Sequence, residues 1–103
     1  MGIAVGMIET IGIASTIEAI DIMLKTADVR VFQQNKTDPA RITTFITGDV
    51  SSVLAAIDVG KQIAERTGAL VAYSVIPTVD QQTLASLIIE NQKNDVRNYE
   101  NRC

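Results

Sequence analysis

Two carboxylates, Glu18 and Asp21, are the residues of this chain whose types and spacing could do chemistry. They lie three residues apart in a segment with helical periodicity, so one helix face would carry both, where such a pair can hold a metal ion or act as general acid and base. The same periodicity places Lys25 four residues after Asp21, which predicts an ordinary ion pair on a solvated face. Because exposed charge pairs are usually of this second kind, we favour the structural interpretation.

The side chains that usually complete a catalytic site are missing or isolated. The sequence contains no His, which removes the commonest general base and metal ligand. Its one cysteine, Cys103, is the last residue and has neither a nearby base nor a partner for an internal disulfide. Tyr73 falls in an expected strand and is interpreted as a packing or interface residue. The sequence therefore predicts no catalytic residue, no metal and no cofactor, and it favours a binding or structural role.

Composition argues against several classes of partner. A length of 103 residues fits one domain, and the aromatic content of 4% predicts a core of aliphatic side chains. The formal charge of −3 argues against nucleic-acid binding and against an anionic membrane surface, because both need clustered positive charge. No run reaches the roughly 20 apolar residues of a membrane span, and Ile3–Ile8 lacks the basic leader of a signal peptide. We expect a cytosolic protein whose modest core would gain from a partner surface.

The first half of the chain alternates strand and helix signals. Residues Ile3–Thr10 read as a strand, Gly12 marks a turn, and Val29–Gln33 reads as a second strand. Between them, apolar residues recur at spacings of three and four, which predicts one apolar helix face; its members are Ile13, Ile17, Ile20, Leu24 and Ala27. A polar loop, Asn35–Ala40, should then join the second strand to a third, Arg41–Thr47.

The second half repeats the pattern. Asp49 is a natural N-cap for a helix that Gly68 should close in a left-handed conformation. One face of this helix carries Val53, Ile57, Gly60 and Ala64. The strand that follows should run over Ala69–Ile76 and stop at Pro77, before a short helix, Gln81–Gln92.

The order β-α-β-β-α-β-α predicts an α+β protein with a ferredoxin-like split β-α-β fold. We expect a four-stranded antiparallel sheet, two main helices on one of its faces, and the short C-terminal helix. Residues 1–92 would form the single domain, and 93–103 a polar, flexible tail.

Two blocks of sequence resemble one known family, the hexameric shell proteins of bacterial microcompartments. Gly6–Lys25, with Thr26–Val29 after it, resembles the family pattern GMIET…EAADAMVKAANV, and Thr47–Val53 resembles its strand-to-helix junction RGDVxxV. Val75-Ile76-Pro77 resembles the start of its VIPRPH segment. Each block alone is weak evidence for the family, but the blocks in this order and at this spacing over residues 3–77 are strong evidence for it.

The resemblance implies a cyclic homohexamer shaped as a flat hexagonal disc, with a pore on its axis for small polar metabolites. Such discs tile edge to edge with other shell proteins around encapsulated enzymes. The segment Ala4–Thr10 looks most like the carboxysome members, which would imply carbon dioxide fixation, whereas a catabolic compartment that handles aldehydes is the alternative. By the same resemblance, Lys25 matches the family's edge lysine and Asp28 a nearby edge residue that is usually Asn.

The chain departs from the family at two places. The pore loop of the family is typically Lys-Ile-Gly-Ser-Gly, whereas the aligned residues here are Lys36, Thr37, Asp38, Pro39 and Ala40. Pro39 fixes its φ angle and offers no N–H, and Asp38 repeated around an axis would form an acidic ring that Lys36 and Arg41 could offset. At the edge, Thr78 replaces an arginine that inserts into the adjacent hexamer. This substitution predicts weaker tiling.

Two other functions fit an α+β domain of this size. A ferredoxin-like small-molecule-binding regulatory domain would need a ligand site at a subunit interface, and the sequence shows no Gly-rich or basic loop for one. A small enzyme would need a convergent set of polar groups, which the absence of His disfavours. The number of subunits separates the first alternative from a shell protein, with two or three expected instead of six.

Overall fold

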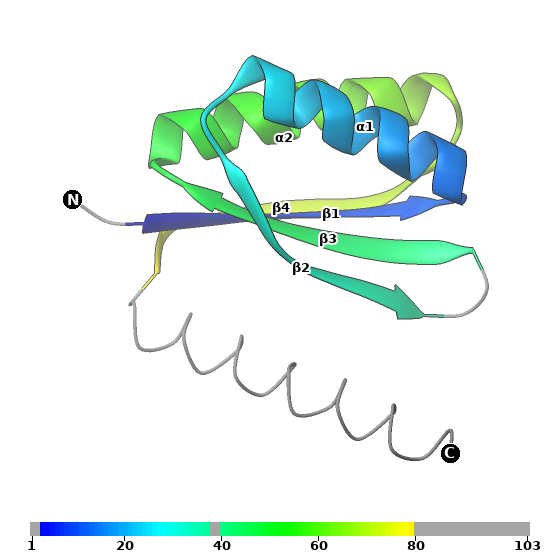
Figure 1. Ribbon diagram of the computed structural model, residues 1–103, viewed down its shortest axis with the longest axis horizontal. Helices are drawn as coiled ribbons and strands as arrows, with labels where there is room; N and C mark the ends of the chain where they lie inside the picture. Colours follow the sequence, from blue (N-terminus) through cyan, green and yellow to red (C-terminus); the bar gives the residue numbers. More distant parts are fainter. Residues whose placement is uncertain (1–2, 38–39, 80–103) are drawn as a thin grey trace, which may run out of the picture.

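The fold is a sheet with both helices on one face. The computed structural model describes residues 3–37 and 40–79. Figure 1 shows the two helices side by side above the strands. In chain order the elements are β1 (Ile3–Ile11), α1 (Ile13–Thr26), β2 (Arg30–Thr37), β3 (Arg41–Gly48), α2 (Val50–Arg66) and β4 (Leu70–Val79).

The sheet has the order β2-β3-β1-β4, and each neighbouring pair is antiparallel. Helix α2 lies over β1 and β4, whereas α1 packs mainly against α2. This arrangement confirms the predicted α+β class with its antiparallel sheet and two helices on one face. The expected helix Gln81–Gln92 and the tail lie outside the described residues.

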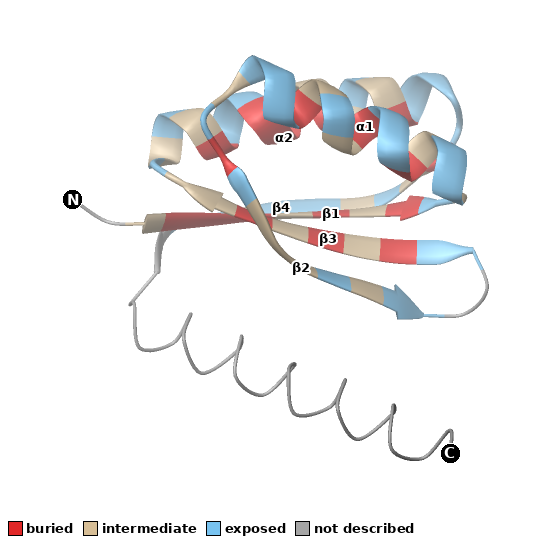
Figure 2. Ribbon diagram, in the orientation of Figure 1, coloured by how far each residue is buried: buried red, intermediate tan, exposed pale blue. Residues whose placement is uncertain are grey.

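The core lies between the helices and the covered face of the sheet. Successive strand residues point to opposite faces, and the alternate residues Ala4 and Ile8 of β1 are buried together with Ile46 of β3. Figure 2 shows the buried positions on the inward sides of both helices and along β1 and β3. Helix α2 contributes the face that its spacing predicted, and all four of its members are buried: Val53, Ile57, Gly60 and Ala64.

Both predicted ends of α2 are confirmed. The Asp49 carboxylate accepts a hydrogen bond from the Ser52 amide at 2.8 Å, as an N-cap does. This bond, followed by the bond from the Ser51 hydroxyl, lowers the pKa of Asp49. After the helix, Gly68 has a φ of 73°, a left-handed conformation that glycine adopts without strain.

The apolar stripe of α1 is one helix face, as predicted, but it is not the face in the core. The buried residues of α1 are Thr16, Ala19 and Met23, whereas Ile13, Ile17 and Leu24 of the stripe are exposed. Thr16, Ala19 and Met23 also recur at spacings of three and four, so the helix has two candidate faces. On the buried face, Met23 lies against Gly60 of α2 and Thr16 is hydrogen-bonded to Thr10 of β1.

Two predicted boundaries are wrong. Strand β2 continues to Thr37, so Asn35, Lys36 and Thr37 pair with β3 instead of forming a loop. Strand β4 continues through Pro77 to Val79. Proline has no N–H to donate to the hydrogen-bond ladder of a central strand, but it is tolerated on an edge strand or at a bulge. Both conditions hold, because β4 is an edge strand and its register with β1 shifts beside Pro77.

In the described part of the chain, neither helix is long and apolar enough to cross a membrane.

Candidate functional site

One end of the domain gathers the start of α1, the start of β3 and the segment that precedes β3. The Gly12 amide donates to the Ala40 carbonyl at 2.7 Å. Gly12 has a φ of 92°, which residues with a side chain rarely adopt, and this conformation turns the chain from β1 into α1. The predicted loop residues Lys36, Thr37 and Ala40 lie at this end, whereas Asp38 and Pro39 lie outside the described residues.

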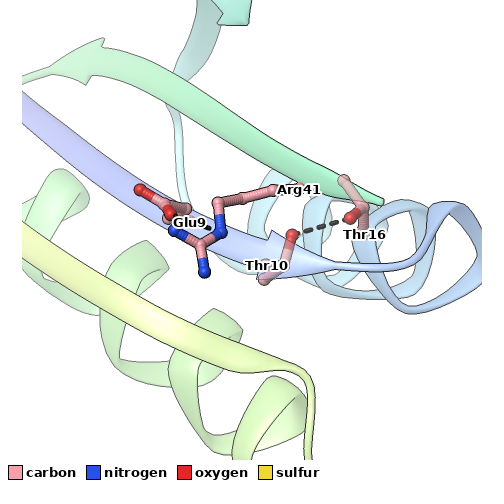
Figure 3. Close-up of polar contacts among 4 residues, drawn as sticks. All are labelled: Glu9, Thr10, Thr16 and Arg41. Carbon is pink, nitrogen blue, oxygen red and sulfur yellow. Dashed lines mark hydrogen bonds and ion pairs between the residues drawn. The ribbon is translucent and has the colours of Figure 1, made fainter. Parts of the chain in front are cut away.

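A buried pair of hydroxyls fixes the junction between β1 and α1. The Thr16 hydroxyl donates to the Gly12 carbonyl at 2.7 Å, and its oxygen lies 2.6 Å from that of Thr10 (Figure 3). Because the Thr16 proton is committed to Gly12, the Thr10 hydroxyl is the donor within the pair. Sequence reasoning missed this pair, although Thr16 and Thr10 flank the glycine that marks the turn.

Replacing Thr16 with valine should destabilise the protein by about 1–3 kcal/mol, because the buried Thr10 hydroxyl loses its acceptor. Urea unfolding followed by circular dichroism measures the loss. The double variant Thr10→Val/Thr16→Val should recover part of it, since both hydroxyls are then gone. Thr26→Val, at an exposed helix position, is the control. A loss no larger than that of the control would contradict the role of the pair.

Charged side chains stand on both faces of the sheet at this end. Arg41 pairs with Glu9 at 3.3 Å on the face that the helices leave open, with side chains 51% and 20% exposed (Figure 3). Lys36 lies directly opposite Ile42, which is buried beneath the helices, so Lys36 belongs to the covered face. The two cations therefore flank the connection between β2 and β3 on opposite faces. The sequence pattern gave no sign of the Glu9–Arg41 pair.

The predicted edge residues lie at the other end of α1. Lys25 occupies the last turn of the helix and pairs with Asp21 at 2.8 Å, as the spacing predicted, and both side chains are exposed. Asp28 follows the helix and is exposed as well. Helix α1 has 14 residues, so about 20 Å separates Lys25 from the Gly12 end. Thr78 lies in β4, and its side chain is outside the description.

Tyr73 lies on β4 beneath a lysine of α2. The Lys61 ammonium is 4.7 Å from the centre of the Tyr73 ring and donates to its hydroxyl at 3.4 Å. This hydrogen bond, with the attraction of the Tyr73 oxygen, raises the pKa of Lys61. Tyr73 is half exposed, so it is a surface residue and not a core residue.

The described residues contain no constellation for catalysis. Over residues 3–37 and 40–79, no cluster of His, Cys, Asp or Glu is placed to hold a metal ion. Glu18 and Asp21 are exposed on α1, and Asp21 is occupied by Lys25. The chain belongs to the BMC domain family, whose profile matches residues 4–79.

Relatives of the chain are microcompartment shell proteins. It is 35% identical over 80 residues to the shell protein EutK of Salmonella typhimurium, a match that covers 78% of this chain and 49% of EutK. It is 40% identical over 78 residues to the carboxysome shell protein CcmK2 of Synechococcus elongatus, covering 74% and 76%.

A microcompartment protein from Desulfitobacterium hafniense has the same fold, with a TM-score of 0.78 and 29% identity over 86% of this chain and 48% of that one. This chain therefore spans about half the length of EutK and of the Desulfitobacterium protein. The chain therefore carries the domain of a microcompartment shell protein.

Proposed function

We propose that the chain forms a cyclic hexamer with a central pore and packs edge to edge in the facet of a microcompartment shell in the bacterial cytoplasm. The placement of the two ends of α1 carries this proposal: the Gly12–Ala40 end would face the six-fold axis, and Lys25 would face the neighbouring hexamer. Other shell proteins would be its partners, with encapsulated enzymes inside the shell.

The pore would be lined by the connection between β2 and β3. Its residues are Lys36, Thr37, Asp38, Pro39 and Ala40. The extension of β2 to Thr37 supports a short connection at the tip of a hairpin. Pro39 would narrow the pore, or Asp38 would make it less favourable to anions. A hexamer structure with Pro39 far from the symmetry axis would overturn this part of the proposal.

The edge of the hexamer would be formed by Lys25, Asp28 and Thr78. Lys25 supports this role by its exposure at the end of α1, where the helix dipole also favours a cation. Because Thr78 lacks the guanidinium that the family inserts across the edge, we propose that the pure protein tiles weakly and serves as a minor or mixed-shell component.

The compartment is proposed to be a carboxysome, which passes bicarbonate and sugar phosphates and fixes carbon dioxide. The resemblance of Ala4–Thr10 and the likeness to CcmK2 support this proposal. EutK is named as a microcompartment shell protein without reference to carboxysomes, so the likeness to it leaves the catabolic alternative open. The neighbouring genes discriminate between the two, because a carboxylase and a carbonic anhydrase are expected beside a carboxysome protein.

Native mass spectrometry of the purified chain tests the hexamer directly, and we expect a mass of six subunits. A species of two or three subunits would instead support a ferredoxin-like small-molecule-binding regulatory domain. The division into a domain of residues 1–92 and a tail of residues 93–103 is tested in the same experiment. A chain that ends at Gln92 should still give the six-subunit mass.

A further inference from the structure

The face of the sheet that the helices leave open carries little charge. Paired residues of neighbouring strands point to the same face, so the register assigns each charged side chain of the described strands to one face or the other. On the open face these side chains are Glu9, Arg41 and Arg30, and Arg30 lies at the far end of β2, opposite Thr47. Glu9 and Arg41 therefore form an isolated pair at the end of the sheet where β2 and β3 connect.

The two partners of this pair differ in how far water reaches them. Glu9 lies in the central strand β1, opposite Thr43 of β3 and Ala72 of β4, and only 20% of its side chain is exposed. Arg41 begins β3, and 51% of its side chain is exposed. Because a partly buried carboxylate among uncharged neighbours needs a counter-ion, Glu9 holds the guanidinium, whose Nε lies 3.3 Å from it (Figure 3). Glu9 thereby cancels the charge of Arg41 at a place that solutes can reach.

In the proposed hexamer, six such pairs would surround the mouth of the pore on the open face. Lys36 belongs to the covered face and would stand at the opposite mouth. A guanidinium binds the oxygens of phosphates and carboxylates in a bidentate way, so six uncompensated copies of Arg41 would retain an oxyanion. Conduction requires binding that is weak enough for the solute to leave. A carboxylate beside each guanidinium would let oxyanions pass this mouth without being held.

We infer that Glu9 sets the affinity of the open-face mouth for small oxyanions, by holding Arg41 as its counter-ion. The inference rests on the proposed hexamer and names a residue that determines what its pore retains. Glu9 is a positioning residue, because it acts through Arg41 and not on the solute. An ion pair that only stabilises the fold would leave the affinity for oxyanions unchanged when it is removed, so the two roles are separable by experiment.

Calorimetric titration of the purified chain with inorganic phosphate at low salt is the test. Glu9→Gln should tighten phosphate binding about tenfold, because the guanidinium charges are then uncompensated. The double variant Glu9→Gln/Arg41→Gln should return to the wild-type affinity, since the net charge of the pair is again zero. Asp58→Asn, at an exposed position of α2, makes the same change in net charge on the other side of the sheet and should leave the affinity unchanged. In 1 M salt, which screens charges beyond about 3 Å, the gain should disappear.

Each outcome has a distinct meaning. If Glu9→Gln binds phosphate no more tightly than the wild type, or if Asp58→Asn tightens it equally, the role of Glu9 is overturned while the hexamer stands. A gain that persists in the double variant would overturn it too, because Arg41 would not be responsible. Glu9→Thr removes the same charge with a residue that strands favour, and it replaces Glu9→Gln if that variant does not fold. A wild-type chain whose native mass is not that of six subunits would overturn the proposed function as well.

Discussion

Gly60→Val is expected to destabilise the fold by roughly 1–3 kcal/mol. A Cβ at position 60 would fall onto the sulfur of Met23 and lie 2.8 Å from its Cγ, with Ile8 Cδ1 3.5 Å away. Met23 is fully buried, so its side chain has no free space into which to turn. Valine favours the helix slightly more than glycine does, so the whole loss would come from packing.

Chemical denaturation of Gly60→Val and of Met23→Ala, separately and combined, measures this contact. Met23→Ala alone should cost about 2–5 kcal/mol. The double variant should be more stable than the sum of the two losses predicts, because the valine occupies the space that the methionine leaves. Ala55→Val, on the exposed side of the same helix, is the control. Additive losses would show that Gly60 and Met23 do not share a packing site.

Helix α2 shows what a sequence pattern determines well. Its start depends on Asp49 and its end on Gly68, both of which act through backbone hydrogen bonds and dihedral angles within a few residues. Its apolar periodicity marks the side that is buried, although Leu54, outside that face, is exposed. These are local properties, and the structure confirms each of them.

Helix α1 shows where the same reasoning fails. Periodicity identified the line of Ile13, Ile17 and Leu24, which is more apolar than the buried line of Thr16, Ala19 and Met23. Both faces of α1 carry apolar side chains at helical spacing, and hydrophobicity alone does not say which of them meets the core. The contacts that each face makes decide the matter, since Met23 lies against Gly60 of α2 and Thr16 is hydrogen-bonded to Thr10 of β1.

The resemblance located the candidate pore loop in the sequence. Where the loop begins and how the charged residues beside it pair could be read only from the register of the sheet. Lys36 and Thr37 were expected in a loop and instead continue β2, which polar residues do readily on an edge strand. The pairing of Glu9 with Arg41 joins positions 32 residues apart in sequence. Only the antiparallel register of β1 with β3 brings them together, since no local pattern connects them.

If the pure protein tiles weakly, as proposed above, Thr78→Arg should make it form extended sheets visible by electron microscopy. A guanidinium at this position would supply planar hydrogen bonds across the edge that the threonine hydroxyl is too short to make. In the proposed hexamer the edge contact would be repeated on every side, so a gain of about 1 kcal/mol per contact would be multiplied across a growing sheet. Thr78→Lys is the matched control, with the same charge but no planar fork. Extended sheets of the unmodified protein would contradict the proposed weakness of its edge.

Adding Lys25→Ala to Thr78→Arg should abolish the sheets and leave the six-subunit mass unchanged. Lys25 is exposed at the end of α1, where only Asp21 among the described residues pairs with it, so its loss should not disturb the fold. Asp21→Asn in the same background removes that ion pair but keeps the lysine. If sheets persist with Asp21→Asn and vanish with Lys25→Ala, the lysine acts across the edge. If both variants keep their sheets, Lys25 is an ordinary C-terminal lysine that the helix dipole favours.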